Sequence, residues 1–230
     1  MTKFQRLFVW AGGAMFVASL ATCAYRYLIV WSRPVPPETD MRLAPLAADV
    51  LLMTAFALHH SVCARDAPKR WIGRVVAQPL LRSVYVWMAS LLLILVCVLW
   101  RPVGGEWWHV GRAVAMAHAA VQLTGLWLIA RAVGGLDPLE LAGIRVSTRS
   151  DALKVAGVYR WVRHPLYLGW MMVVFGAAHM TGDRLAFAVI TSAYLVVAVP
   201  WEERSLVRSF GEDYERYQQQ VRWRIIPFVY

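Results

Sequence analysis

The chain has 230 residues, of which 59% are hydrophobic and 17% are charged, and its mean hydropathy is +0.48. A soluble domain carries about 25% charged and about 45–50% apolar residues. This composition therefore excludes a water-soluble globular domain and indicates an integral membrane protein. The net charge is +10, but the basic residues are spread over loops between apolar runs. That distribution excludes a nucleic-acid-binding domain and leaves membrane lipids as the expected surroundings.

Six apolar segments predict transmembrane helices, at about 7–31, 44–63, 83–100, 113–133, 165–181 and 185–201. The first segment runs past the ~7–15 residues of a signal-peptide core, so we expect it to be retained. The fifth and sixth are short for a hydrocarbon core of ~30 Å. A turn signal at residues 181–184 joins them, which predicts a short helical hairpin.

A C-terminal amphipathic helix is predicted after the hairpin, because apolar residues recur there every three or four positions. Only Gly211 interrupts the stripe, which consists of Leu206, Phe210, Tyr214, Tyr217 and Val221. The expected fold class is all-α: a polytopic helical membrane protein with about six transmembrane helices and this terminal helix. We divide it into a four-helix transmembrane module, residues 1–135, and a second module, residues 136–230, that contains a polar connection, the hairpin and the tail.

The distribution of basic residues predicts the orientation. Eighteen of the 24 Lys and Arg residues fall in the N-terminus, in the loops after the second and fourth helices, and in the C-terminal tail. Since cytoplasmic loops carry an excess of Lys and Arg, both termini are expected in the cytoplasm, and a plasma (inner) membrane location is the simplest interpretation. The oligomeric state is left open.

Several polar residues outside the loops are interpreted as structural. The three cysteines, Cys23, Cys63 and Cys97, lie in or beside apolar runs without metal-ligand spacing, so no metal site is expected. His118 and Gln122, one turn apart in the fourth helix, are expected to form hydrogen bonds between helices. His179, near the far side of the membrane, is interpreted as a packing residue.

The stretch GVYRWVRHPLYLG, residues 157–169, combines several features of a binding site. Pro165 favours the first position of a helix, which puts His164 near the N-cap. The free backbone N–H groups there favour an anion, and Arg163 adds a planar guanidinium suited to a carboxylate or phosphate. Gly169 leaves room for a ligand to approach the backbone. Two aromatic rings flank the site, those of Tyr159 and Tyr167.

Two adjacent carboxylates, Glu202 and Glu203, follow the sixth helix, which ends on the face where the fifth begins. Ionisable groups at this depth are costly and are usually functional. They would accept hydrogen bonds from sugar hydroxyls or neutralise a cation, so the combined site suits a zwitterionic, sugar-bearing cofactor. Taken alone, each motif has a simpler interpretation, as a basic cluster beside the membrane or as a solvated helix end.

The combination resembles the isoprenylcysteine carboxyl methyltransferase superfamily of integral membrane enzymes. The resemblance covers residues 155–228 and rests on Gly157-Val158-Tyr159, on residues 163–169, on Glu202-Glu203, on residues 210–217 and on Ile226-Pro227-Phe228. It implies S-adenosylmethionine as cofactor, held by Tyr159, His164, Pro165, Tyr167, Gly169, Glu202 and Glu203, with either glutamate as the direct contact. The implied catalytic residues are Arg163, His164, Glu203 and Arg204, of which Arg163 or Arg204 would position an anionic substrate or the cofactor carboxylate.

The first half is similar to the methanethiol S-methyltransferase branch. The similar stretches are His60-Ser61-Val62, Ala64-Arg65, Lys69-Arg70-Trp71, residues 82–86 and Trp100-Arg101-Pro102. This branch implies methyl transfer to a small thiol such as methanethiol, with His60 and Arg163 near the substrate. A shorter connection before Gly157 departs from the branch, so other acceptors stay open: an isoprenylcysteine carboxylate, a phospholipid amine, or none, in a non-catalytic protein that retains the scaffold.

Overall fold

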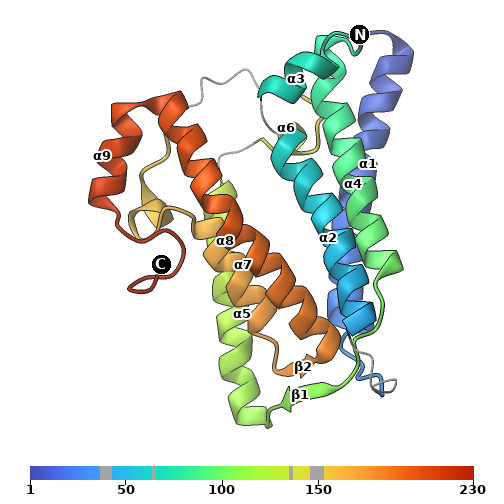
Figure 1. The fold of residues 1–230 in the computed structure, drawn as a ribbon, viewed down its shortest axis with the longest axis vertical. Helices are drawn as coiled ribbons and strands as arrows, with labels where there is room; N and C mark the ends of the chain where they lie inside the picture. Colours follow the sequence, from blue (N-terminus) through green and yellow to red (C-terminus); the bar gives the residue numbers. More distant parts are fainter. Residues whose placement is uncertain (37–42, 64–65, 135–136, 146–152) are drawn as a thin grey trace. The chain divides into compact units, whose positions relative to one another are not determined.

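The protein is predominantly helical, as predicted. The computed structural model describes residues 1–36, 43–63, 66–134, 137–145 and 153–230 (Figure 1). Among these residues, five helices are long and apolar enough to cross a membrane. They are α1 (Lys3–Tyr25, continued by the π-helical turn Arg26–Val30), α2 (Leu43–Cys63), α4 (Leu81–Leu99), α5 (Arg112–Val133) and α8 (Gly182–Phe210). Arg42, Arg65 and Arg149, which enter the orientation argument, lie outside the described residues.

The remaining elements are short. Four helices are α3 (Asp66–Ile72), α6 (Pro138–Leu141), α7 (Pro165–Phe175) and α9 (Glu212–Gln220). Two turns of 3-10 helix cover Gln78–Leu80 and Gly157–Arg160. The two strands β1 (Glu106–His109) and β2 (His179–Thr181) pair antiparallel as a small ribbon.

The chain forms two compact units. The first comprises Met1–Gly105 with Leu136–Thr148, and the second Glu106–Gly135 with Arg149–Tyr230. In the first unit α4 packs against α1 and α2, and the indole N–H of Trp87 donates to the carbonyl of Phe8 at 3.1 Å. In the structure, α5 belongs to the same compact unit as the C-terminal half of the chain. The predicted boundary at residue 135 instead places α5 with the first three transmembrane helices. The division into functional modules stays a prediction.

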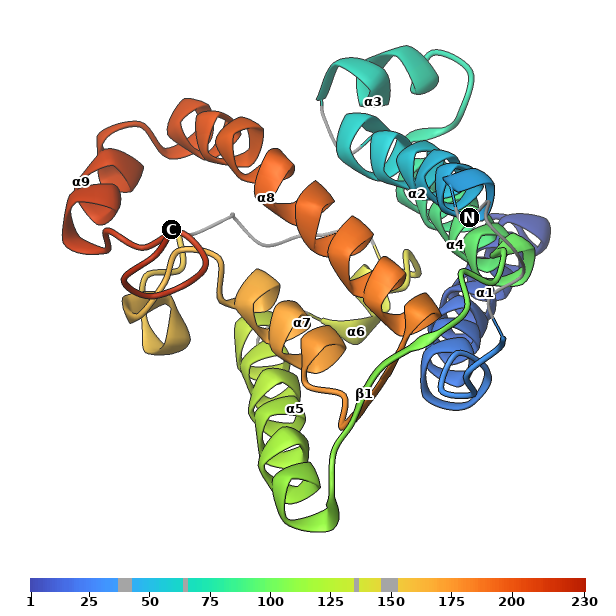
Figure 2. The same cartoon turned by 60° about the horizontal axis from the view of Figure 1, so that its bottom comes forward.

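The second unit is built on close packing between α5 and α7, which lie side by side in Figures 1 and 2. Gly125 of α5 and Gly169 of α7 face each other, so that a Cβ on either would lie under 3 Å from the carbonyl oxygen of the other. Gln122 donates to the carbonyl of Val173 at 2.9 Å, and the His118 ring lies 3.3 Å from the carbonyl oxygen of Gly176. The predicted interhelical role of His118 and Gln122 is confirmed.

The hairpin differs from its predicted lengths. The fifth helix ends at Phe175 instead of residue 181, and its 11 residues measure about 16 Å at ~1.5 Å per residue. After Gly176 the chain leaves the helix and enters β2 at His179, where it pairs with β1. Apolar periodicity cannot reveal this long-range contact. The connection to α8 is therefore half of the ribbon instead of a simple turn, and Thr181 caps α8 by accepting from the backbone N–H of Arg184.

The sixth helix is long instead of short. It has 29 residues and continues through Pro200 to Phe210, because a proline removes one donor without necessarily ending a helix. Gly211, with a φ of +54°, ends it in a conformation that other residues rarely adopt. The predicted terminal helix is thus split between the end of α8 and α9, but its stripe still forms one cluster: Tyr214, Tyr217 and Val221 are buried, with Leu206 and Phe210 against them.

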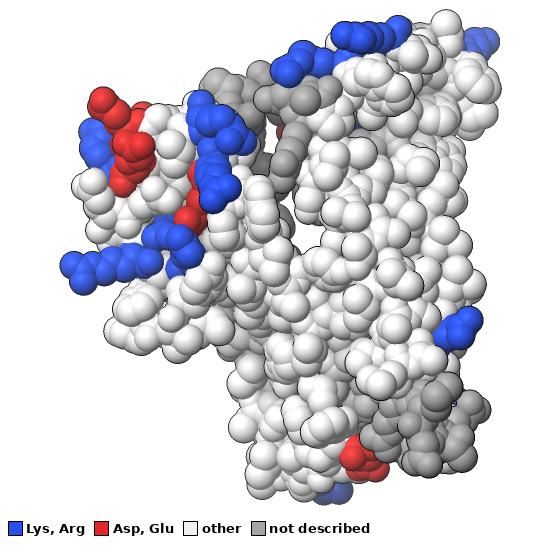
Figure 3. Space-filling model, viewed as in Figure 1, with Lys and Arg blue, Asp and Glu red and all other residues white. Residues whose placement is uncertain are grey.

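The second unit has two polar ends. Helix α5 starts at the β1–β2 ribbon, α7 returns to it, and α8 leaves it again. Figure 3 shows charged side chains over α9 and the adjoining end of α8 and others near the start of α5, with an uncharged surface between them. This pattern suits helices whose middle sections face lipid.

The α5–α7 packing predicts an unusual response to alanine. Gly→Ala in a helix interior normally stabilises by about 1 kcal/mol. At Gly125 the new Cβ would lie 2.6 Å from the carbonyl oxygen of Gly169, so we expect Gly125→Ala to lower the free energy of unfolding by about 1–3 kcal/mol. Thermal unfolding in detergent measures this. Gly111, at the start of the same helix, has no atom within 4 Å of its built Cβ, so Gly111→Ala is the matched control. Equal midpoints for the two variants would contradict the packing.

Candidate active site

The start of α7 presents two stacked aromatic rings. His164 is the N-cap and Pro165 the first helical residue, as predicted. Tyr167 lies on the same face as His164, since residues three apart are neighbours on a helix, and the two ring centroids are 5.2 Å apart with planes at 14°. His164 is buried, so its ring is held in one place by the helix start and by the tyrosine.

Helix α8 brings both glutamates to this ring. Nε2 of His164 lies 3.3 Å from Oε1 of Glu203, and Nδ1 lies 3.6 Å from Oε2 of Glu202. The hydroxyl of Tyr167 donates to the same Oε2 of Glu202 at 2.5 Å. The contact with Glu203 is within hydrogen-bonding distance, whereas the contact with Glu202 is longer. The helix start and the paired glutamates, 35 to 40 residues apart in the chain, therefore form one cluster.

The two glutamates differ in their surroundings. The Glu203 side chain is only 6% exposed. Its carboxylate lies 2.6 Å from Nε of Arg163 and 3.3 Å from Nε of Arg224, and it accepts a hydrogen bond from the Gln218 amide at 3.3 Å. Two guanidinium groups thus compensate its buried charge. The Glu202 side chain is 43% exposed, which leaves its carboxylate accessible from outside the cluster.

Arg163 also ties the C-terminal segment to α7. Its Nη1 donates to the carbonyls of Val221 and Arg222 at 2.7 and 3.0 Å. The backbone N–H of Arg163 donates to Trp223, and that of His164 donates to Arg224. In the structure, Arg163 therefore clamps the tail and Glu203 together; its predicted role in positioning an anionic ligand stays a prediction.

A pair of tyrosines connects the cluster to α5 and α9. The hydroxyl of Tyr217 donates to the carbonyl of Tyr159 at 2.7 Å, and that of Tyr159 donates to the carbonyl of Ala132 at 3.2 Å. Burial raises the pKa of both phenols, and the charge of Glu202 raises the pKa of Tyr159 further. Both therefore remain protonated hydrogen-bond donors at neutral pH.

A cavity of about 460 Å³ opens beside Glu203. Ligand pockets typically measure about 300–1,000 Å³. The lining is mixed in charge and consists of Pro200, Glu203, Arg204, Val207, Arg208, Gln218 and Arg224. Its arginines suit a carboxylate, and the accessible carboxylate of Glu202 beside the His164 and Tyr167 rings suits hydroxyl or cationic groups. These charged and aromatic groups therefore fit the zwitterionic, sugar-bearing cofactor expected from the sequence.

Two predicted site residues, Gly169 and His60, have other contacts in the structure. Gly169 packs against Gly125, so close helix packing explains why position 169 is a glycine. A role for Gly169 in binding the cofactor stays a prediction. His60 belongs to the other compact unit, where its Nδ1 lies 2.8 Å from the hydroxyl of Tyr85. Two residues in contact with Glu203 were not predicted, Gln218 and Arg224; the only signal for Gln218 is its position one turn from Tyr214 on α9.

The chain resembles known membrane methyltransferases. The family described as phospholipid methyltransferase matches residues 114–213. A methanethiol S-methyltransferase of Crocosphaera subtropica is 33% identical over 98% of this chain and 94% of its own length. Methanethiol S-methyltransferase 1 of Bradyrhizobium diazoefficiens is 33% identical over 94% of this chain and 81% of its own. A protein-S-isoprenylcysteine O-methyltransferase of Xenopus laevis is 35% identical over 35% of this chain and 28% of its own. No solved structure matches.

The difference between the two glutamates predicts unequal effects on stability. Glu203→Gln keeps the side-chain shape but leaves the buried Arg163 without a carboxylate. Removing one partner of a buried ion pair costs about 3–5 kcal/mol, so we expect a marked fall in the thermal midpoint in detergent. Glu202→Gln, the matched control at the half-exposed neighbour, should cost about 1 kcal/mol or less. Similar midpoints for the two variants would show that Glu203 does not hold the cluster together.

Proposed function

The chain belongs to the methanethiol S-methyltransferase family, and we propose that it transfers the methyl group of S-adenosylmethionine to methanethiol, giving dimethyl sulfide. The observation that carries this proposal is the cluster in which the His164 ring faces both Glu202 and Glu203. It combines an open carboxylate, two stacked rings and nearby arginines at one end of the α5–α7–α8 unit. These groups match the charges and hydroxyls of the proposed donor.

The two glutamates would have separate roles. Glu202, which is accessible and oriented by Tyr167, would contact the cofactor, with the His164 and Tyr167 rings beside it. Glu203, which is buried by Arg163 and Arg224, would position His164 and the tail. Arg204, which lines the cavity next to Glu203, is the candidate for the cofactor carboxylate. When bound, S-adenosylmethionine supplies an electrophilic methyl group on a sulfonium.

The acceptor must be a thiolate when it reacts, because the thiolate is the nucleophilic form of a thiol, so a thiol that enters the site would first lose its proton to water. Positive charge near the acceptor favours that form, and the guanidinium of Arg204 would supply it. Holding the two reactants in line at about 3–3.5 Å would account for much of the acceleration of this displacement. A small, uncharged thiol can enter such a site from lipid or from water.

The orientation follows from the basic residues. Arg163, Arg204, Arg208, Arg222 and Arg224 all lie at the end of the unit that carries the cluster. Since cytoplasmic segments are enriched in arginine and lysine, we propose that this end faces the cytoplasm and that the protein lies in the plasma (inner) membrane. The cofactor, a soluble cytoplasmic metabolite, would then reach the site from water.

Cofactor affinity tests the role of Glu202. Loss of a charge-assisted hydrogen bond costs about 1.5–3 kcal/mol, so Glu202→Gln should weaken S-adenosylmethionine binding about 10- to 150-fold. Tyr167→Phe, which keeps the ring but removes the donor, should weaken it by a smaller factor. Calorimetric titration of the purified protein measures both. Glu215→Gln, at an exposed carboxylate of α9, is the control; wild-type affinity in Glu202→Gln would assign the contact to another residue.

An acceptor comparison tests the reaction. The purified protein is supplied with S-adenosylmethionine labelled in the methyl group and with methanethiol, an isoprenylcysteine analogue or phosphatidylethanolamine. We expect label in headspace dimethyl sulfide, and a rate at least about tenfold lower in His164→Ala, which loses contacts to both carboxylates. If the label appeared only in the isoprenylcysteine analogue or only in the lipid, the protein would still be a methyltransferase, but with that compound as its acceptor. Cofactor binding without transfer to any of the three would support the non-catalytic alternative.

A further inference from the structure

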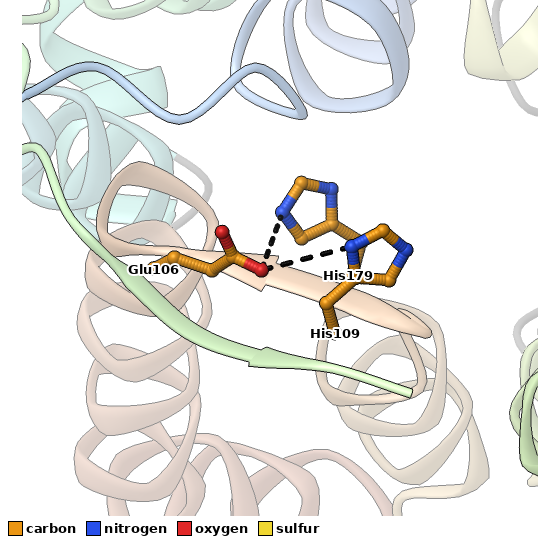
Figure 4. Close-up of side chains that lie close together, drawn as sticks. All are labelled: Glu106, His109 and His179. Carbon is orange, nitrogen blue, oxygen red and sulfur yellow. Dashed lines mark ion pairs between the residues drawn. The ribbon is translucent and has the colours of Figure 1, made fainter. Parts of the chain in front are cut away.

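A second cluster of polar side chains lies at the opposite end of the same unit. Glu106 and His109 of β1 and His179 of β2 point toward one another from the two-stranded ribbon (Figure 4). Their closest ligand atoms, one from each residue, all lie within 4.8 Å of one another. The ribbon joins the connection before α5 to the connection between α7 and α8, so this cluster is separate from the His164 site.

The pairing of the strands explains why these three side chains share one face. His109 lies directly opposite His179 in the antiparallel register, and directly opposed residues point to the same side of a sheet. Residues 106 and 109 would lie on opposite faces of a regular strand. The register is irregular between Glu106 and Trp108, and an extra residue of this kind re-aims the side chains beyond it. The irregularity brings Glu106 to the side of the two histidines.

The distances suit a small divalent cation. Oε1 of Glu106 lies 3.5 Å from Nε2 of His179 and 3.7 Å from Nδ1 of His109. Tetrahedral zinc with bonds of about 2.0–2.1 Å separates its ligand atoms by roughly 3.3 Å. The centroids of the two rings are 4.5 Å apart, and each ring has a nitrogen near the Glu106 carboxylate. The two glutamate–histidine distances exceed that separation by a few tenths of an ångström, and all three ligand atoms lie within 4.8 Å of one another.

The cluster sits on a fixed support. The indole N–H of Trp108 donates to Ala177 at 3.0 Å, the backbone N–H of Val110 donates to Ala178 at 3.0 Å, and Nη1 of Arg184 donates to the carbonyl of His179 at 2.7 Å. Within the described part of the chain, Nε2 of His179 is shielded from solvent and makes no hydrogen bond. A shielded imidazole nitrogen directed at a carboxylate is ready to bind a cation.

We propose that Glu106, His109 and His179 form a binding site for a divalent transition metal, with zinc as its best match. Two imidazoles and one carboxylate select zinc or a neighbouring first-row ion over magnesium or calcium, and three protein ligands leave a position for water. The sequence predicts no metal site because no ligands are suitably spaced along the chain. In the structure, the ribbon brings together two histidines that are 70 positions apart. Bound metal would cross-link β1 to β2 and thereby fix the ends of α5, α7 and α8.

Metal titration tests this site on the full-length protein, purified without a polyhistidine tag and dialysed against a chelator. We expect one zinc equivalent to bind, the thermal midpoint to rise with zinc but not with magnesium, and cobalt(II) to give the visible bands of a tetrahedral site. His109→Ala and His179→Ala should each weaken zinc binding at least about 100-fold, since even outer-shell changes cost about 10–100-fold.

The matched control is His59→Ala, a histidine of the other compact unit, which should bind zinc like the wild type. Failure of the unmodified protein to bind zinc would overturn the proposal without recourse to any variant, as would binding that persists in both ribbon variants or disappears in the control. Glu106 would then only contact the two histidines of the ribbon. None of these outcomes depends on methyl transfer, so the result is independent of the proposed function.

Discussion

The buried carboxylate of Glu203 is the contact on which the candidate site depends. It joins α8, the start of α7 and the C-terminal segment, through His164, Arg163 and Arg224. A charge at this depth is expensive unless it is paired and hydrogen-bonded, and each partner of Glu203 also binds another element: Arg163 holds Val221 and Arg222, and Arg224 bonds to Tyr230. Loss of the carboxylate would therefore loosen three segments at once, and the position of Glu202 follows from the position of its neighbour.

Adjacent residues can divide structural and binding roles because successive positions on a helix point about 100° apart. Glu203 points into the protein, whereas Glu202 points along the surface toward Tyr167. The exposed glutamate can change partners when a ligand arrives, since its charge is already solvated. The buried one cannot, because its release would strand Arg163. This asymmetry favours a site that is formed before the ligand binds, with little reorganisation at the binding step.

Local signals in the sequence were sufficient for the elements that define the site. Pro165 at the first helical position and His164 before it follow from backbone chemistry alone. The apolar runs predicted the long helices α1, α2, α4 and α5 and the position, but not the length, of α8. The lengths of α7 and α8 were wrong because they depend on contacts distant in sequence: β1 ends α7 by pairing with residues 179–181, and α8 continues through Pro200. The packing role of Gly169 could not be predicted without knowing that Gly125 of another helix faces it. The contact of Arg224 with Glu203 could not be predicted without knowing the path of the C-terminal tail.

The short α7 also explains why both ends of the unit need firm anchors. Non-helical backbone is tolerated inside a membrane protein only where protein buries it and pairs its polar groups. Met180 and Thr181, which continue the chain beyond α7, are fully buried, and β1 pairs with this strand. At the other end, the Arg163 clamp pairs the backbone of residues 163 and 164 with the tail. Because α7 packs tightly on α5 between these anchors, a metal that tightened the ribbon would act on the same rigid helix whose first turn carries His164 and Tyr167.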